Sequence, residues 1–437
     1  MSPQSPQSTQ STQANSERTR VLVNLTWLVP GVVGGSEEST TDALRALAAD
    51  LPADLEIHLA VLQPFVSAHP DLVESFSCHV LATSGSNKFA RVLAEQTWLA
   101  RLSRKIDAQV VHHAGGVVPL LHPGRVVLTI HDLQPLDLSQ NFSTTKRLYL
   151  RLMLGRSAKA ADVICVPSEF TSQRVIALLG VDQKRIRIVP WCLRAMPDVT
   201  GSSAHATTHA TTHHTTHSTT PASTHSEQSD SLEPSAVRAK LEQRGSPYFL
   251  YPAVTYPHKN HLMLLDAFAV LRQSYPQTSL VLTGAAGPME ESVQKRIGQL
   301  DLQEAVQRTG RVSAAELEDL YAGASAVVLP SLYEGFGLPA LEAMARGCLV
   351  IGSDRGSLPE VLAAQDLVDP EDLTAWAAAM QAVLVMSDSQ RATRREAGLS
   401  RAAAFSPART AAALCDSYRL VAVASGRRAV GEASDDT

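Results

Sequence analysis

Short runs of valine, isoleucine and leucine alternate with helical patterns in two separate halves of the chain. In the first half such runs lie at 20–28, 56–62, 108–113, 125–130 and 161–167. In the second half they lie at 247–253, 279–284, 325–330 and 348–354. Strands that are apolar along their whole length are typical of parallel sheets covered by helices on both faces. The pattern predicts an α/β protein with two Rossmann-like, doubly wound parallel-sheet domains that face a central cleft.

A stretch rich in Ser, Thr and His separates the two halves. Residues 197–236 have too few apolar side chains to offset the entropy of ordering, and the Ser/Gln/Thr-rich residues 1–19 are similar. The chain of 437 residues is also longer than one hydrophobic core usually supports. We therefore expect a disordered tail (1–19), an N-terminal domain (20–195), a disordered linker or insertion (196–243), a C-terminal domain (244–408), a helix that returns to the N-terminal domain (409–424) and a tail (425–437).

This separating stretch also contains a group of histidines, namely His205, His209, His213, His214, His217 and His225. Neutral imidazoles bind zinc, copper and nickel, so a metal site is one interpretation. The spacing is irregular and no cysteine or carboxylate cluster accompanies the histidines. A solvated spacer is therefore the favoured interpretation.

Composition excludes several classes of function. A formal charge of −5 with 19% charged residues does not favour a nucleic-acid partner. The five cysteines are scattered and lie mostly in apolar runs, which predicts reduced, buried thiols rather than disulfides. We find no signal peptide and no apolar run of about 18 residues, so a cytoplasmic protein is expected.

The segment EGFGLPALEAMARG (334–347) carries the strongest chemical signal. Glu334 follows a predicted strand, and Pro339 fits the first turn of a helix, where its missing N–H costs nothing. The glycines between them let the backbone and the helix N-terminus approach an anion such as phosphate. Glu342 lies one turn into the helix, so a carboxylate flanks the turn on each side, an arrangement that suits a nucleotide sugar. An ordinary strand-to-helix loop, with Glu334 as a helix-dipole partner, explains the spacing equally well.

Together with the Val-Ile strand that follows it and SDRGSLPEV (353–361), this segment resembles the E-x(7)-E region of retaining glycosyltransferase family 4. The resemblance covers most of the chain outside the termini and residues 197–243. It implies a GT-B fold, with an acceptor domain at 20–195 and a nucleotide-sugar-binding domain at 244–408. It also implies transfer of a sugar from a nucleoside diphosphate to an acceptor hydroxyl with retention, without a metal or other cofactor. General likeness suggests a mannose or rhamnose donor and a role in surface glycan or lipid-linked oligosaccharide synthesis.

The same resemblance assigns roles to residues of the turn. It implies that Glu334 contacts the hydroxyls of the donor sugar and that Glu342 contacts the ribose. The backbone of the residues between them would hold the diphosphate, namely Gly335, Phe336, Gly337 and Leu338.

A second segment, YPAVTYPHKNHLMLLDAF (251–268), looks like the family's strand end with a lysine before a helix. Lys259 would then neutralise the diphosphate leaving group. Many members carry an arginine five or six residues earlier, where this chain has Val254 and Ala253. An exposed lysine at a helix start is the alternative.

The first domain contributes LVPGVVGGSEES (28–39) after its first strand. Gly34 and Gly35, with Ser36 as a candidate N-cap, resemble the family's glycine loop that closes over the donor phosphates. The segment also resembles a degenerate dinucleotide-binding turn. Because the full G-x-G-x-x-G is absent, a nicotinamide enzyme is disfavoured.

TIHDLQPLD (129–137) places His131 and Asp132 after another strand. Such a pair could be a general base with its orienting group, a metal-ligand pair or a capped turn. The resemblance implies that His131 lies beside the donor sugar. His112 and His113 match no motif, and we interpret them as structural.

The last donor-binding candidates lie in GRVSAAELEDLYAGAS (310–325). The resemblance implies that the backbone of Val312 reads the base and that Leu317 packs under its ring. The same residues also form an ordinary amphipathic helix pattern.

Basic residues gather in two groups: Lys146, Arg147, Arg151, Arg156 and Lys159, and Arg101, Arg104 and Lys105. They could contact anionic lipid beside a lipid-linked acceptor at the inner face of a membrane, but a solvated helix face is the commoner explanation.

Two other functions remain open from the sequence. One is a nucleotide-sugar epimerase or hydrolase, with Asp132 and Asp137 as the near candidates for acid–base work. The other is a non-catalytic nucleotide-sugar-binding partner.

Overall fold

The computed structural model describes residues 18–32, 34–83, 88–115, 117–138, 144–193, 238–239, 241 and 245–432. Side chains at 88–90, 144–147 and 424–432 are not described. The expectations for the His-rich stretch and for nearly all of the N-terminal tail lie outside these residues.

The described part of the N-terminal lobe contains a seven-stranded sheet in the order β3-β2-β1-β4-β5-β6-β7, with parallel neighbours throughout. Its strands are β1 (Thr19–Asn24), β2 (Leu55–Leu62), β3 (Ser77–Leu81), β4 (Val110–His113), β5 (Arg125–Thr129), β6 (Val163–Val166) and β7 (Ile186–Ile188). Its helices are α1 (Gly35–Ala49), α2 (Gln63–Ala68), α3 (Pro70–Ser75), α4 (Lys88–Ala94), α5 (Ala100–Lys105), α6 (Gln134–Asp137), α7 (Thr144–Ala160) and α8 (Glu169–Leu179), with a π-helix at Glu95–Leu99.

The described part of the C-terminal lobe contains a six-stranded parallel sheet in the order β10-β9-β8-β11-β12-β13. Its strands are β8 (Tyr248–Pro252), β9 (Ser279–Thr283), β10 (Val306–Gly310), β11 (Ala326–Leu329), β12 (Val350–Ser353) and β13 (Leu367–Val368). Its helices are α10 (His261–Ser274), α11 (Glu290–Gln299), α12 (Ala314–Gly323), α13 (Leu338–Ala345), α14 (Leu358–Val361), α15 (Leu373–Leu384) and α16 (Asp388–Ala403). The predicted fold class, two Rossmann-like lobes, is confirmed.

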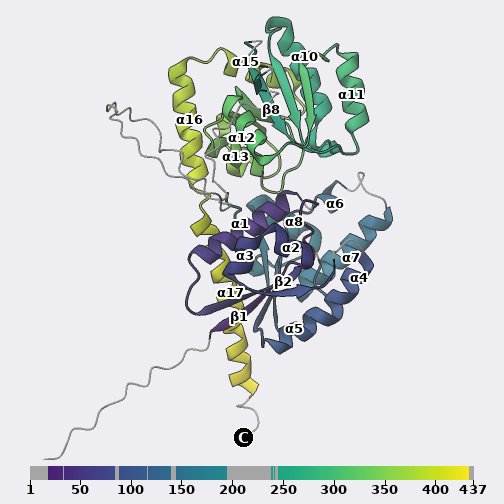
Figure 1. Ribbon diagram of the computed structural model, residues 1–437, viewed down its shortest axis with the longest axis vertical. Coiled ribbons are helices and arrows are strands. Elements are labelled where there is room, and N and C mark those ends of the chain that lie inside the picture. The colour runs from purple at the N-terminus through teal and green to yellow at the C-terminus, as the bar shows by residue number, and fades with distance from the viewer. Residues whose placement is uncertain are drawn as a thin grey trace, which may run out of the picture.

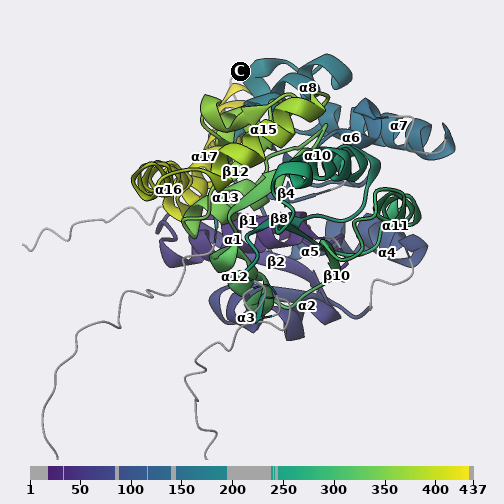
Figure 2. The same cartoon turned by 90° about the horizontal axis from the view of Figure 1, so that it is seen from above.

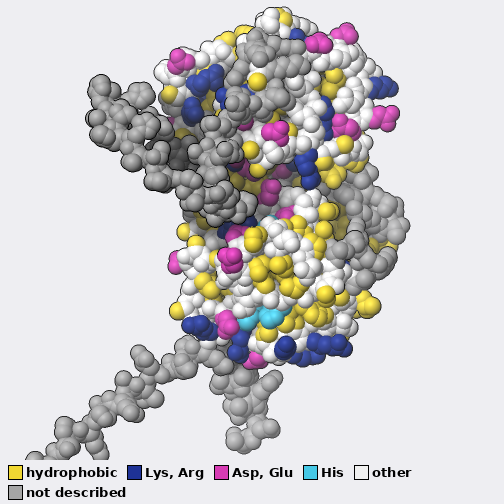
Figure 3. All heavy atoms as spheres, in the orientation of Figure 1, with side chains coloured by type: hydrophobic (Ala, Val, Ile, Leu, Met, Phe, Trp, Pro, Cys, Tyr) yellow, Lys and Arg dark blue, Asp and Glu magenta, His cyan; other side chains and the backbone are white. Residues whose placement is uncertain are grey.

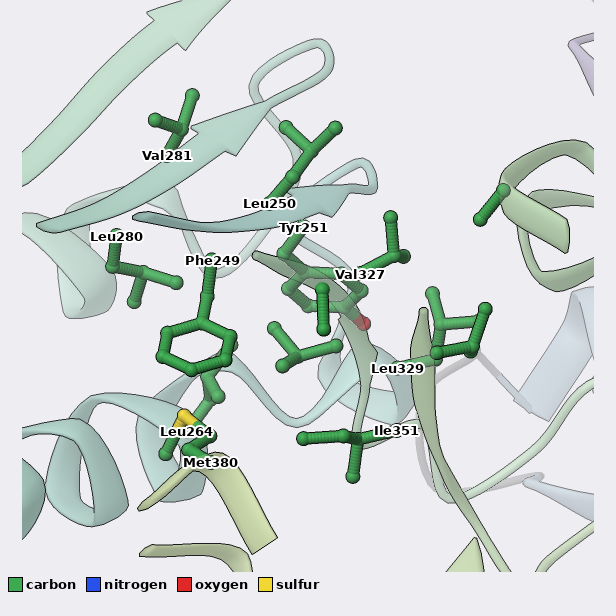
Figure 4. Close-up of a cluster of buried hydrophobic side chains, with 14 of the residues drawn as sticks. Phe249, Leu250, Tyr251, Leu264, Leu280, Val281, Val327, Leu329, Ile351 and Met380 are labelled. Carbon is green, nitrogen blue, oxygen red and sulfur yellow. The ribbon is translucent and has the colours of Figure 1, made fainter. Parts of the chain in front are cut away.

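Each lobe buries its own apolar core between sheet and helices. Figure 4 shows the C-terminal core, where Phe249 and Leu280 from the sheet meet Leu264 and Met380 from the helices. The apolar strands β8, β9, β11 and β12 form where the sequence predicts them, because both faces of these strands are covered.

The strands missing from the prediction are β3, β7, β10 and β13, at the two edges of each sheet. Edge strands are short and partly exposed, so polar side chains are tolerated in them, as in VQRTG of β10. These strands therefore lack the continuous apolar pattern on which the prediction depends.

The last helix, α17 (Pro407–Glu432), leaves the C-terminal lobe and runs along the N-terminal lobe (Figure 1). It packs against α1 and the N-terminal sheet. The Tyr418 hydroxyl lies 2.9 Å from Nδ1 of the buried His112, and Thr410 Oγ1 donates to the carbonyl oxygen of Pro190 at 2.8 Å. The chain thus crosses between the lobes twice, near Pro190 and again near residue 405.

Both sheets reverse their strand order at a central pair, β1 and β4 in one lobe and β8 and β11 in the other. Ligands of open α/β sheets bind beyond the carboxyl ends of strands at such switch points. In the view from above, β8 of the upper lobe overlies β1 and β4 of the lower lobe (Figure 2). The loops that follow these strands are therefore where we look for a site.

Candidate active site

Lys259 and Glu334 follow the two strands at the switch point of the C-terminal lobe. Lys259 Nζ donates to Glu334 Oε1 at 2.5 Å, and the two side chains are only 17% and 11% exposed. A lysine and a glutamate this well shielded interact more strongly than a surface pair, because little solvent screens their charges. The structure therefore brings together two residues that the sequence analysis selected 75 positions apart.

A second donor fixes the same carboxylate. The buried Ser331 hydroxyl donates to Glu334 Oε1 at 2.7 Å. Both donors converge on one oxygen, and within the described residues Glu334 Oε2 accepts no hydrogen bond. Oε2 is left to accept hydrogen bonds from ligand hydroxyls. Ser331, which lies just beyond the end of β11 (Ala326–Leu329), was not among the residues selected from the sequence.

The turn after Glu334 leads directly into α13. Gly337 is the N-cap with φ +94°, a conformation that favours glycine, and Pro339 occupies the first turn of the helix. Among the described residues, the N–H groups of residues 335–338 donate to no protein acceptor. Free N–H groups and the positive end of the helix dipole form a site for an anion of phosphate size.

Glu342 lies one turn into α13, next to an aromatic hydroxyl. Tyr321 donates to Glu342 Oε2 at 2.8 Å, and Arg346 donates to the Glu342 carbonyl oxygen at 2.9 Å. Burial raises the pKa of Glu342 to about 7 in spite of the Tyr321 hydrogen bond, which lowers it. Glu342 therefore changes charge near neutral pH. Tyr321 was not among the residues selected from the sequence.

In the N-terminal lobe, His131 follows β5. Its Nε2 lies 2.9 Å from the carbonyl oxygen of Ala114, which makes Nε2 the protonated nitrogen and leaves Nδ1 as an acceptor. Nδ1 is buried and has no hydrogen-bond partner among the described residues. Burial lowers the pKa of His131 to about 4, so the ring is neutral at pH 7. A neutral ring with a free acceptor can bind a hydroxyl hydrogen.

The His131 ring packs against two indoles. Its centroid is 5.6 Å from that of Trp27 and 5.6 Å from that of Trp191. Trp191 in turn lies 5.4 Å from Phe336 of the turn before α13. Sequence analysis selected neither tryptophan. Aromatic packing therefore connects His131 in one lobe with the anion-binding turn in the other.

The loop after β5 also contacts the C-terminal lobe directly. Gln134 Nε2 lies 2.5 Å from His258 Nδ1, and the Leu133 N–H donates to the Tyr333 hydroxyl at 3.2 Å. A Cβ built on Gly335 would lie 2.8 Å from the His131 carbonyl oxygen. The His131 loop and the turn after Glu334 are therefore in contact between the lobes. On the face drawn in Figure 3, acidic side chains lie along the boundary between the lobes.

The glycine loop after β1 differs from the expectation in one respect. Gly34 is the N-cap of α1 with φ +75° and offers no side-chain cap, whereas Ser36 lies inside the helix. The prediction that Ser36 is the N-cap is wrong, because Gly35 is already the first helical residue. Gly34 supplies the left-handed conformation at the helix start.

Residues of the 310–325 segment lie near this loop. Arg311, the residue before Val312, donates to the carbonyl oxygen of Gly31 in the opposite lobe at 3.1 Å. Leu317 lies in α12 and packs partly buried against the C-terminal core.

His112, interpreted above as structural, and Arg156, from the first basic group, both make hydrogen bonds within the protein. His112 contacts Tyr418 and the Thr129 hydroxyl, and burial lowers its pKa to about 3. Arg156 donates to the backbone carbonyl of Val118, so it belongs to a loop contact and not to a free basic surface. Within the described residues, no group of three or more His, Cys, Asp or Glu side chains is arranged to hold a metal ion.

Comparison with known proteins agrees with this geometry. Residues 235–399 match the family model "Glycosyl transferases group 1", and residues 33–193 match "Glycosyltransferase Family 4". O-antigen chain mannosyltransferase B of Escherichia coli is 29% identical over 302 residues, which cover 68% of this chain and 71% of that protein. O-antigen chain mannosyltransferase RfbU of Salmonella typhimurium is 26% identical over 298 residues, covering 67% and 70%.

Solved structures show the same fold. A glycosyltransferase from Rickettsia africae has a TM-score of 0.64 at 16% identity, covering 92% of this chain and 98% of that chain. Anabaena Alr3699/HepE in complex with UDP and glucose also has a TM-score of 0.64 at 16% identity, covering 91% and 99%. Two Rossmann-like lobes with parallel sheets, together with these structural neighbours, define the GT-B fold. The chain is a glycosyltransferase of the family 4 type, since its N-terminal half matches the family 4 model and its C-terminal half matches the group 1 model.

Proposed function

We propose that the protein is a retaining hexosyltransferase that moves a sugar, mannose or rhamnose, from a nucleoside diphosphate to a glycan hydroxyl. The observation that carries the proposal is the Lys259–Glu334 pair beside the free N–H groups at the start of α13. This arrangement offers a cation and backbone donors to a diphosphate, and a carboxylate oxygen to sugar hydroxyls. The two relatives of this chain named above are O-antigen chain mannosyltransferases, which supports mannose as the donor sugar.

In the proposed mechanism, the bond between the anomeric carbon and the diphosphate oxygen breaks while the acceptor oxygen bonds to the same face of that carbon. The acceptor proton passes to the departing diphosphate oxygen. Lys259 and the N–H groups of residues 335–338 stabilise the charge that grows on the leaving group. Protein groups supply this positive charge, so we propose that no metal ion is required.

The other selected residues bind the donor in this proposal. His131 Nδ1 accepts a hydrogen bond from a sugar hydroxyl, and Glu342 accepts from the ribose. The backbone of Val312 contacts the base, with Leu317 beneath it. Gly34 and Gly35 close over the phosphates from the opposite lobe.

We also propose a lipid-linked or surface glycan acceptor, reached from the N-terminal lobe. Exposed Leu148, Tyr149 and Leu152 lie on α7 with the exposed Arg151, a combination that suits peripheral contact with a lipid surface. No helix in the described parts of the chain is long and apolar enough to cross a bilayer.

The test is a donor screen. Purified protein is heated with each of a panel of nucleotide sugars at one concentration, and the donor that binds most tightly raises the melting temperature most, because stabilisation grows with the logarithm of its concentration over Kd. The stabilising donor is then incubated with lipid-linked glycan acceptors, and product anomers are read by NMR. An inverted anomer would contradict the retaining mechanism, and rapid epimerisation or hydrolysis of the donor alone would favour the other enzyme class.

A further inference from the structure

The N-terminus of α8 holds a carboxylate from the opposite lobe. The backbone N–H groups of Glu169 and Phe170 donate to Oε2 and Oε1 of Glu360, at 2.8 and 2.7 Å. α8 belongs to the N-terminal lobe, whereas Glu360 lies in α14 of the C-terminal lobe. The positive end of a helix thus binds an anion across the cleft. Ser168 caps the same helix by accepting from the Thr171 N–H at 3.1 Å.

The same end of α8 also contacts the anion-binding turn. The Ser168 hydroxyl donates to the Gly335 carbonyl oxygen at 2.7 Å, and the Thr171 hydroxyl lies 3.1 Å from that oxygen. Ser168 is 2% exposed and Thr171 is fully buried, so water competes little for these bonds. A peptide unit is planar, so fixing the Gly335 carbonyl fixes the direction of the Phe336 N–H.

The segment around Glu360 supports the other side of this turn. The Ser357 N–H and hydroxyl both donate to the Glu334 carbonyl oxygen at 3.1 Å. Arg401 donates to the carbonyl oxygens of Glu360 and Val361, which ties α14 to α16. Glu360 is therefore fixed relative to Glu334 and moves with the C-terminal lobe.

We propose that the α8 N-terminus and Glu360 form a latch between the lobes, and that Ser168 and Thr171 are positioning residues for the donor diphosphate. Lobe closure places Glu360 on α8 and, at the same time, orients the turn that binds the phosphates. Donor binding and closure then favour each other, since each supplies the arrangement that the other requires. This inference depends on the proposed function for its ligand, but the latch itself can be tested without ligand.

The first test uses Glu360→Ala in the full-length chain, with Glu360→Gln as the conservative variant. The exposed Glu396→Ala on α16 is the matched control. We expect Glu360→Ala to raise KM for the donor roughly tenfold, because hydrogen bonds to a charged group are lost, and to change kcat by less than about twofold. At a saturating concentration the bound donor restores closure, so the substitution should change KM and not kcat. Glu360→Gln should lie between wild type and Glu360→Ala.

The second test measures coupling between the two parts of the latch. Thr171→Val keeps the shape of the side chain and removes the hydroxyl, and the Ser168 cap remains. Alone it should raise KM roughly threefold, but in the Glu360→Ala background it should have little further effect, because the lobes no longer close onto it. Additive effects of the two substitutions would overturn the coupling.

Small-angle X-ray scattering separates the latch from the proposed function. Without ligand, Glu360→Ala should have a larger radius of gyration than wild type and Glu396→Ala, with an unchanged melting temperature. Addition of GDP, UDP or dTDP, whichever stabilises wild type, should reduce the radius. Equal radii for wild type and Glu360→Ala, or an unchanged KM, would overturn the latch. Failure of wild type to bind any nucleotide would instead contradict the proposed function.

Discussion

Lys259 Nζ lies 2.5 Å from Glu334 Oε1, and the two residues come from loops after the central strands β8 and β11. A lysine paired in this way is pre-positioned, and a diphosphate can use its remaining donors without moving it. Glu334 in turn keeps one oxygen for the sugar. The pair therefore connects the leaving group with the transferred sugar.

Substitution of Glu334 should strongly slow sugar transfer while the fold remains. Glu334→Gln keeps the size of the side chain but removes the charge that positions Lys259, so we expect kcat/KM to fall roughly 10²- to 10³-fold. The measurement is the initial rate of product formation with the donor found by screening. Retained transfer would show that this carboxylate has no part in the reaction, and the exposed Glu396→Ala is the control.

Removal of Lys259 should affect both activity and stability. Lys259→Met leaves Glu334 shielded and without its cation, so we expect about 1–3 kcal/mol less free energy of unfolding. The double variant Lys259→Met/Glu334→Gln should recover most of that stability but none of the activity. Urea unfolding and initial rates measure the two effects. If the double variant were no more stable than Lys259→Met, the pair would not be the cause of the loss.

Glu342 should make stability and donor binding depend on pH. Its pKa is about 7 in the folded protein against an ordinary value of 4.5, so between these values the folded state keeps a proton that the unfolded state has lost. The contribution of Glu342 to the free energy of unfolding is therefore fully present below pH 4.5 and is lost as the pH rises through 7. Glu342→Gln should therefore be more stable than wild type at pH 8, by roughly 3 kcal/mol, and equal to it at pH 4.

The same variant should raise KM for the donor more at pH 8 than at pH 6. An ionised carboxylate accepts two ribose hydrogen bonds, whereas the protonated form resembles the amide. Parallel pH profiles for wild type and Glu342→Gln would show that this group does not titrate in the donor site.

The contact between α17 and the N-terminal sheet should be structural only. Tyr418→Phe leaves Nδ1 of the buried His112 without a partner, which should cost about 1–2 kcal/mol of unfolding free energy. The values of kcat and KM should stay the same, since neither Tyr418 nor His112 contacts the turn after Glu334. Tyr275→Phe, at a partly exposed tyrosine, is the control for loss of a hydroxyl. A large change in kcat with unchanged stability would contradict a structural role.

The sequence predicted the fold, and it selected candidate residues around α13, because both depend on local patterns. Continuous apolar runs identified the central strands, and the spacing from Glu334 to Glu342 placed one carboxylate before α13 and one within it. Tyr321, Ser331 and Ser168 were missed because their role arises only when distant segments meet. A serine at a strand end has no pattern that distinguishes it before its partner is known.

The contacts between the lobes could not be predicted from the sequence either, because they too arise only when distant segments meet. Nothing near Glu360 in the chain indicates that its partner is the start of α8, 190 residues away. The tryptophans around His131 are likewise ordinary apolar residues until the fold brings them together. Local patterns therefore select candidate residues within each lobe, whereas the contacts between the lobes are seen only in the structure.

Closure of the lobes should require that residue 335 has no side chain. A Cβ there would lie 2.8 Å from the His131 carbonyl oxygen and 3.0 Å from Asp132 Cβ, both in the opposite lobe. Because these neighbours belong to the other lobe, Gly335→Ala should hold the lobes apart without straining either core. We expect kcat/KM to fall at least about tenfold while the melting temperature changes little. Gly155→Ala in α7, where a Cβ meets no atom within 4 Å, is the matched control and should leave kcat/KM unchanged. Wild-type kinetics in Gly335→Ala would mean that the reaction does not require the His131 loop and the Glu334 turn to meet.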